Sequence, residues 1–344
     1  MKPQQHSNRN RQSFFQKYSI ISLIFIVITS LLIPFILKDS ESAPPQNTAP
    51  LAYSSPATTF TSPTIPAKSQ TPSLTTPNSP GLTVAATTPF PSGLPDSAGN
   101  WTLVFSDEFN SRSLDPKKWV TCYWWDNKGC TNAGNNELEW YQPGNVSVDQ
   151  GLLNLRAQKE VVHASDGKTY NYTSGMVTTG NIGENSVDPP RFAFEYGYVE
   201  VRAKIPYGKS FWPSIWLLPV SQKWPPEIDI MELVGDYPMT VNMTAHFIQP
   251  DGTNGEKGGK WSGPDFSAGF HDFGLNWTPQ EITWYVDGIV RQREKNKNHI
   301  PAEPMYLILN LAVGGNWPGN PDARTAFPSS FEIDYVRVWQ TRPS

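Results

Sequence analysis

Short segments rich in β-branched and aromatic residues constrain the fold of this 344-residue chain more than any other feature. Gly, Pro, Asn and Asp separate these segments, which is typical of strands. No long amphipathic helix competes with them, so the pattern favours an all-β sandwich over βαβ units. About 245 residues are acceptable for a single β sandwich. The segments are 103–105, 145–157, 197–206, 213–219, 241–247, 282–288, 305–312 and 332–339.

One stretch near the middle of the chain places three carboxylates, Glu227, Asp229 and Glu232, among strand-forming apolar residues. The alternation of a strand puts Glu227 and Asp229 on one face. Strict alternation would then bring Met231, not Glu232, to that face. A β-bulge that absorbs one residue would return Glu232 to it, and bulges are common beside active sites. We therefore predict a bulged strand that presents three acids on one face.

The spacing of these acids suits a particular chemistry. Four strand steps of about 3.3 Å put the terminal Cα atoms roughly 13 Å apart. Side chains that lean together would bring the two Glu carboxyl groups to about 5 Å, the range of a retaining glycosidase, whereas an inverting enzyme needs a wider gap. Asp229 would raise the proton affinity of the acid/base through like-charge coupling. For an isolated Glu-x-Asp pattern, the alternative is a solvated strand face without chemistry.

Nine ordered blocks are spread from Phe105 to Gln340, and together they are far more specific than any one of them. They are FSDEF at 105–109, NNELEWY at 135–141, EYGYVEVRAKIP at 195–206, FWPSIWLLP at 211–219, EIDIME at 227–232, TAHF at 244–247, WYVDG at 284–288, GGNWPG at 314–319 and DYVRV at 334–338. This region resembles glycoside hydrolase family 16, and most closely its laminarinase-like members.

The resemblance implies a two-sheet antiparallel jelly-roll sandwich (concanavalin A-like) with a long substrate cleft across its concave sheet. It also implies hydrolysis of internal β-glycosidic bonds with retention. Glu227 would be the nucleophile, Asp229 the helper and Glu232 the acid/base. The family usually has Gly immediately before the first catalytic Glu, whereas this chain has Pro225-Pro226, and residues 183–190 look like an insertion.

We expect tryptophans to bind the substrate, because indole faces stack on the apolar faces of sugar rings. The alternative is a place in the core, which we predict for Trp277, Trp284 and Trp339 because they lie in strand-like runs. The four tryptophans predicted to bind substrate are Trp212, Trp216, Trp224 and Trp317.

Four polar residues in the matched blocks are further candidates for contact with sugar. Asn135 and Glu137 could bond hydroxyl groups. Arg202 could do the same, or could form an ordinary salt bridge across the sheet. His246 is either a satisfied structural histidine or, as the family match favours, a cleft residue near the nucleophile.

The two cysteines, Cys122 and Cys130, could close a small loop as a disulfide in an oxidising compartment, or could be free thiols. A zinc site is not expected, since no histidine pair sits at ligand spacing. The resemblance instead suggests a structural calcium ion held by Glu108, Asp334 and the carbonyl of Gly151, since calcium prefers oxygen ligands. The alternative is two surface acids without an ion.

The N-terminal hundred residues differ from the rest of the chain. Residues 1–18 form a basic, cytoplasmic N-terminus, and 19–37 are apolar and free of charge. About 19 residues nearly span a bilayer core of roughly 30 Å, so a signal-anchor is favoured over a cleaved signal peptide. Residues 38–98 should be a disordered Pro/Ser/Thr-rich linker, followed by the catalytic domain at 99–344. That domain would lie at the cell surface, or be secreted if 19–37 is cleaved.

The net charge of −4, with acids and bases interspersed, argues against nucleic acid, which would require a basic stripe. We therefore expect an endo-β-1,3-glucanase, monomeric in its catalytic domain, that acts on laminarin-like or mixed-linkage glucans. The alternatives are a galactan hydrolase or a transglycosylase of the same family, and a non-catalytic β-glucan-binding protein. Retention of all three acids counts against the last alternative.

Overall fold

The computed structural model describes residues 101–124, 130–181 and 188–341. The predicted cytoplasmic terminus, membrane segment 19–37 and linker 38–98 lie outside these ranges, and so do Trp125 and most of the predicted insertion. Within the described ranges, no helix is long and apolar enough to cross a bilayer.

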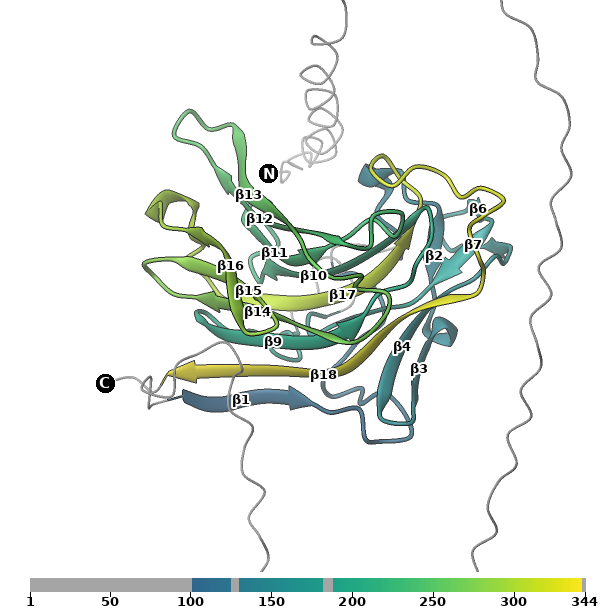
Figure 1. Ribbon diagram of the computed structural model, residues 1–344, viewed down its shortest axis with the longest axis horizontal. Helices are drawn as coiled ribbons and strands as arrows, with labels where there is room; N and C mark the ends of the chain where they lie inside the picture. Colours follow the sequence, from purple (N-terminus) through teal and green to yellow (C-terminus); the bar gives the residue numbers. More distant parts are fainter. Residues whose placement is uncertain (1–100, 125–129, 182–187, 342–344) are drawn as a thin grey trace, which may run out of the picture. The chain divides into compact units, whose positions relative to one another are not determined.

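Two antiparallel sheets build the described part of the chain (Figure 1). The larger has eight strands in the order β16-β15-β14-β9-β18-β4-β3, with β1 also paired to β18. Its strands are β1 (Trp101–Asp107), β3 (Val146–Asp149), β4 (Leu152–Ala157), β9 (Gly197–Lys204), β14 (His271–Trp277), β15 (Ile282–Val286), β16 (Ile289–Glu294) and β18 (Ser329–Thr341).

The smaller sheet has six strands in the order β13-β12-β11-β10-β17-β8. These are β8 (Met176–Thr178), β10 (Phe211–Pro219), β11 (Glu227–Glu232), β12 (Thr240–Ile248), β13 (Asn254–Ser262) and β17 (Met305–Val313). Two small sheets pair β2 (Glu139–Tyr141) with β7 (Tyr172–Ser174) and β5 (Val162–His163) with β6 (Thr169–Tyr170). The short 3-10 helices are η3 (Ala133–Asn135), η4 (Pro143–Asn145) and η5 (Lys297–His299).

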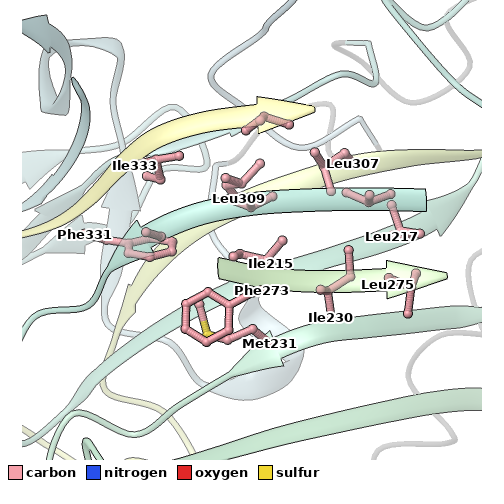
Figure 2. Packing of buried hydrophobic residues seen from close by; sticks show 14 of the residues in the cluster. Ile215, Leu217, Ile230, Met231, Phe273, Leu275, Leu307, Leu309, Phe331 and Ile333 are labelled. Atoms are coloured by element: carbon pink, nitrogen blue, oxygen red, sulfur yellow. The ribbon is translucent and has the colours of Figure 1, made fainter. Parts of the chain in front are cut away.

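The core lies between the two large sheets and follows from strand alternation. Every second residue of β9 and β10 is apolar and buried, and β11 and β18 follow the same alternation except where one bulge in each shifts the register. Figure 2 shows these side chains meeting across the sandwich, with Ile215 and Leu309 from one sheet and Phe331 from the other. Full burial of one such side chain is worth about 1.5–3 kcal/mol. The prediction of an all-β antiparallel sandwich is confirmed.

The predicted core tryptophans are placed as expected. Trp277 and Trp284 are fully buried and Trp339 is 2% exposed. The indole nitrogen of Trp284 donates to the backbone oxygen of Asp229 (2.8 Å). A core residue of the larger sheet therefore supports the acidic strand of the smaller one.

Candidate active site

The central strand β11 contains the predicted bulge. Its register with β10 shifts between Ile215 and Trp216, and its register with β12 shifts between Asp229 and Glu232. Ile230 and Met231 are both buried in the core. Two consecutive side chains therefore enter the core, and Glu232 returns to the face that carries Glu227. The prediction of a bulged strand is confirmed.

Glu227 and Glu232 line one pocket on the six-stranded sheet, while Asp229 is 1% exposed between them. Three of the four predicted substrate tryptophans line this pocket, and so do three of the predicted polar residues. The lining residues are Tyr123, Asn132, Asn135, Glu137, Trp212, Ser214, Trp216, Trp224, Glu227, Glu232, His246 and Asn310.

Two tryptophans hold the two glutamates by hydrogen bonds. The indole nitrogen of Trp212 donates to Glu232 Oε1 (3.0 Å). The indole nitrogen of Trp224, a residue that is half exposed, donates to Glu227 Oε2. Trp317 does not line the pocket, but its ring meets that of Trp212 edge-on at 5.2 Å. Each glutamate thus has one neutral donor and a neighbouring aromatic surface.

His246 on β12 lies opposite Glu227 in the strand register. Its Nε2 lies 3.0 Å from Asp229 Oδ2, and its ring is 5.9 Å from that of Trp224. Burial disfavours the charged imidazole, but the hydrogen bond and charge of Asp229 raise its pKa to about 10. His246 is therefore a cation within the acidic cluster.

Burial and like charges raise the pKa of all three acids. For Glu232 burial is the largest cause and the charge of Glu227 adds to it, giving a pKa of about 7. Burial and the charge of Asp229 raise the pKa of Glu227 to about 8, although His246 and Trp224 lower it, so in the free protein the proton is not confined to Glu232. Burial and the charge of Glu232 raise the pKa of Asp229, against the lowering effect of His246. The pair of glutamates can therefore hold a proton near neutral pH.

Arg202 is not in the pocket, and its predicted contact with sugar is wrong. It lies on β9 of the eight-stranded sheet, where its guanidinium pairs with Asp272 (3.1 Å) and Asp334 (3.2 Å). The alternation of β9 is clear in the sequence, but the sheet to which the strand belongs is not. The alternative weighed for this residue, a salt bridge across the sheet, describes its position.

Of the three residues predicted to hold calcium, Glu108 follows β1, Gly151 lies between β3 and β4, and Asp334 is in the middle of β18. Glu108 is bound through both oxygens by Arg337 (2.8 and 2.6 Å), and Asp334 is paired with Arg202. An ion would therefore have to displace two guanidinium groups, and the donor set as it stands does not fit calcium. The calcium ion stays a prediction, which the unfolding temperature in calcium and in EDTA would test.

A different group of side chains comes close enough to share a metal ion. One ligand atom each of Glu227, Asp229 and His246 lies within 4.8 Å of the others. A metal ion bound there would have to displace the proton that His246 holds in its ion pair with Asp229. Of the two alternatives for the cysteines, the structure contains the disulfide, because Cys122 and Cys130 are bonded with their Cα atoms 5.1 Å apart.

Four pocket residues were not predicted, namely Tyr123, Asn132, Ser214 and Asn310. Ser214 shares a strand face with Trp212 and Trp216, and Asn310 interrupts an otherwise apolar strand. Polar residues inside apolar runs are thus the signal that could have found these two. Asn310 also accepts from the indole nitrogen of Trp216 (2.8 Å). Tyr123 and Asn132 lie in loops and carry no such signal.

The sequence model of glycosyl hydrolases family 16 matches residues 134–337. The chain belongs to this family. The match confirms the resemblance drawn from the nine sequence blocks. A second model, for β-glucan synthesis-associated proteins SKN1/KRE6/Sbg1, matches residues 2–220.

Characterised relatives and solved structures agree with this membership. An endo-1,3-1,4-β-glycanase, EglC, of Rhizobium meliloti is 36% identical over 258 residues, which are 69% of this chain and 51% of the relative. A β-glucanase of Rhodothermus marinus is 36% identical over 269 residues, 71% of this chain and 87% of the relative. The chain thus spans about half the length of the first relative.

The laminarinase catalytic domain of Thermotoga maritima superposes with a TM-score of 0.60 at 36% identity, over 71% of this chain and all of that one. A variant of LamA from Zobellia galactanivorans, in complex with laminaritriose and laminaritetraose, gives a TM-score of 0.60 at 34% identity, over 70% and 99% of the two chains.

Proposed function

We propose that this protein is a retaining endo-β-1,3-glucanase that cuts internal bonds of laminarin-like, and also mixed β-1,3/1,4, glucans. The observation that carries the proposal is the bulged strand β11, which turns Glu227 and Glu232 into one tryptophan-lined pocket. Relatives that act on β-1,3 and β-1,3-1,4 glucans support the choice of substrate.

The reaction proceeds by double displacement. The Glu227 carboxylate attacks the anomeric carbon while Glu232 protonates the departing glycosidic oxygen. Glu232 then accepts a proton from a water molecule as the water oxygen attacks the anomeric carbon. The bond between the sugar and Glu227 breaks, and the sugar is released. Repulsion between the two carboxylates keeps one of them protonated, as this division of roles requires. His246 and Trp224 favour the ionised form of Glu227, and His246 holds Asp229 in place.

The substrate lies along the indole faces of Trp212, Trp216 and Trp224, with Trp317 beside them. Asn135 and Glu137 on the pocket wall bond hydroxyl groups of the glucan. A neutral polysaccharide suits this lining, because among the described residues its only cation is His246, which Asp229 already pairs.

The full-length protein should release reducing ends from laminarin and, more slowly, from lichenan. Agarose and carrageenan serve as controls for the galactan alternative. Glu227→Gln and Glu232→Gln, which keep the size of each side chain, should abolish release. NMR of the first product should show the β-anomer, and short oligosaccharides should appear at random from early times. The proposal would be overturned if the protein released reducing ends from no glucan, or if Glu227→Gln kept full activity.

Transglycosylation is a second candidate. The match to β-glucan synthesis-associated proteins over residues 2–220 favours it, because a sugar hydroxyl can intercept the glycosyl-enzyme in place of water. Incubation with laminarihexaose distinguishes the two candidates, since a transglycosylase forms products longer than six units and a hydrolase forms only shorter ones.

We also propose that residues 19–37 anchor the protein in a membrane with its catalytic domain outside the cytoplasm. Nineteen consecutive residues without charge support this proposal. The protein should then resist alkaline carbonate extraction and dissolve in detergent. Recovery of the protein from the medium without its N-terminus would favour cleavage instead.

A further inference from the structure

Two buried carboxylates in the pocket wall have no part in the double displacement. Glu137 lines the pocket and is 8% exposed, whereas Glu139, the first residue of β2, is fully buried behind it. No lysine or arginine of the described ranges forms an ion pair with either residue. Two buried acids without a counter-ion are costly unless they are neutralised or well bonded.

Two of the four carboxylate oxygens of Glu137 and Glu139 accept a hydrogen bond. Asn135 Nδ2 donates to Glu137 Oε1 (2.9 Å), and the backbone nitrogen of Val313 donates to Glu139 Oε2 (2.7 Å). Within the described part of the chain, Glu137 Oε2 and Glu139 Oε1 find no donor. The two side chains lie close enough for each to shift the pKa of the other. One proton between them would therefore satisfy both residues and remove one of the two charges.

The surroundings decide which residue holds the proton. Burial raises the pKa of Glu139, and the charge of Glu137 raises it further. Burial also raises the pKa of Glu137, but hydrogen bonding, first of all to Glu139, lowers it. Glu139 is therefore the donor and Glu137 the acceptor. Asn135 and a protonated Glu139 would fill two of the about four lone-pair sites of the Glu137 carboxylate, so it can accept a further bond in the pocket.

We infer that Glu139 keeps its proton and donates it to Glu137, and that this bond holds Glu137 ionised in the pocket wall as an acceptor for a glucan hydroxyl group. The inference rests on the proposed function for the identity of the ligand. Glu137 is then a substrate-binding residue, and Glu139 is a positioning residue that acts through it. The charge of Glu137 also raises the pKa of Glu232, so the pair influences the acid/base.

Three variants of the full-length protein separate these roles. Glu139→Gln is the matched control, because an amide oxygen can accept from Val313 while its NH₂ group donates to Glu137, as a protonated carboxyl does. Glu139→Met keeps the length of the side chain but removes the donor. Glu137→Gln removes the charge from the pocket wall. KM, kcat and the pH profile with laminarin are measured for each.

We expect Glu139→Gln to leave KM, kcat and the pH profile within about twofold of the parent. Glu137→Gln should raise KM about tenfold, because it removes a hydrogen bond to a charged group. It should also lower the pKa of Glu232, which moves the alkaline limb of the pH profile to lower pH. Glu139→Met should raise KM with kcat less affected. Equal impairment of Glu139→Gln and Glu139→Met, or an unchanged KM in Glu137→Gln, would overturn the inference.

Urea unfolding against pH tests the pair without any substrate. The folded-state pKa of Glu139 lies above its unfolded value, so its contribution to stability is complete below about pH 4.5 and is lost as pH rises through the folded value. Glu139→Gln should remove that loss, whereas Glu137→Gln should reduce it only in part, because burial still raises the pKa of Glu139. If the parent cleaves no glucan, the proposed function fails while this measurement still decides the state of Glu139. Identical pH dependence in the parent and Glu139→Gln would contradict the shared proton.

Discussion

His246 controls the charge of the catalytic cluster at the scale of single residues. Its cation lowers the pKa of Glu227, Asp229 and Glu232 together. His246→Gln should therefore raise all three values and move the acid limb of kcat/KM to higher pH, because the nucleophile must be ionised. Each unit of upward shift should cost about tenfold in rate on that limb. Tyr123→Phe is a control in the same pocket, and an unchanged acid limb in His246→Gln would contradict the role of the cation.

The alkaline limb depends on a different residue. Glu232 must be protonated to act as the acid, and its pKa is about 7. We expect kcat/KM to fall as pH rises through about 7. An aryl glucoside with a good leaving group needs no such proton, so Glu232→Gln should retain glycosylation of that substrate and lack the alkaline limb. Pre-steady-state release of the phenol measures this step, and a limb that persists in Glu232→Gln would rule out the assignment.

At the scale of single strands, some features could be predicted from the sequence and others could not. The bulge in β11 could be predicted because Met231 breaks an otherwise regular alternation. Strand β13, with the sequence NGEKGGKWS, was missed because its glycines and lysines read as a turn. It forms an edge strand, where pairing with β12 rather than side-chain burial decides the structure. Arg202 was misplaced for a related reason, since alternation fixes the face of a strand but not its sheet.

Substitutions of Met231 measure how much the packing of the bulge contributes to the free energy of unfolding. It is fully buried between the sheets, so Met231→Ala should lower the free energy of unfolding by about 2–5 kcal/mol, the cost of a core cavity. Met231→Leu, which conserves volume, should cost less than about 1.5 kcal/mol. Urea titration at pH 5 measures both. Equal stability of the Ala variant and the parent would mean that the second core-facing residue of the bulge carries no packing energy.

At the scale of the whole molecule, the catalytic carboxylates should lower stability while they provide function. Burial raises the pKa of Glu232 from 4.5 to about 7, so the folded state binds its proton more tightly than the unfolded chain does. The stability that this proton supplies is complete below about pH 4.5 and is lost as pH rises through about 7. Glu232→Gln carries no such proton and should therefore be more stable than the parent at pH 8, by up to about 3 kcal/mol. The difference should shrink toward pH 4.5, where the parent is protonated in both states. Asp149→Asn, at an exposed acid on β3, is the control and should change stability little at either pH. A Glu232→Gln variant no more stable than the parent at pH 8 would mean that the pocket solvates this carboxylate as well as water does, and the alkaline limb would then need another group.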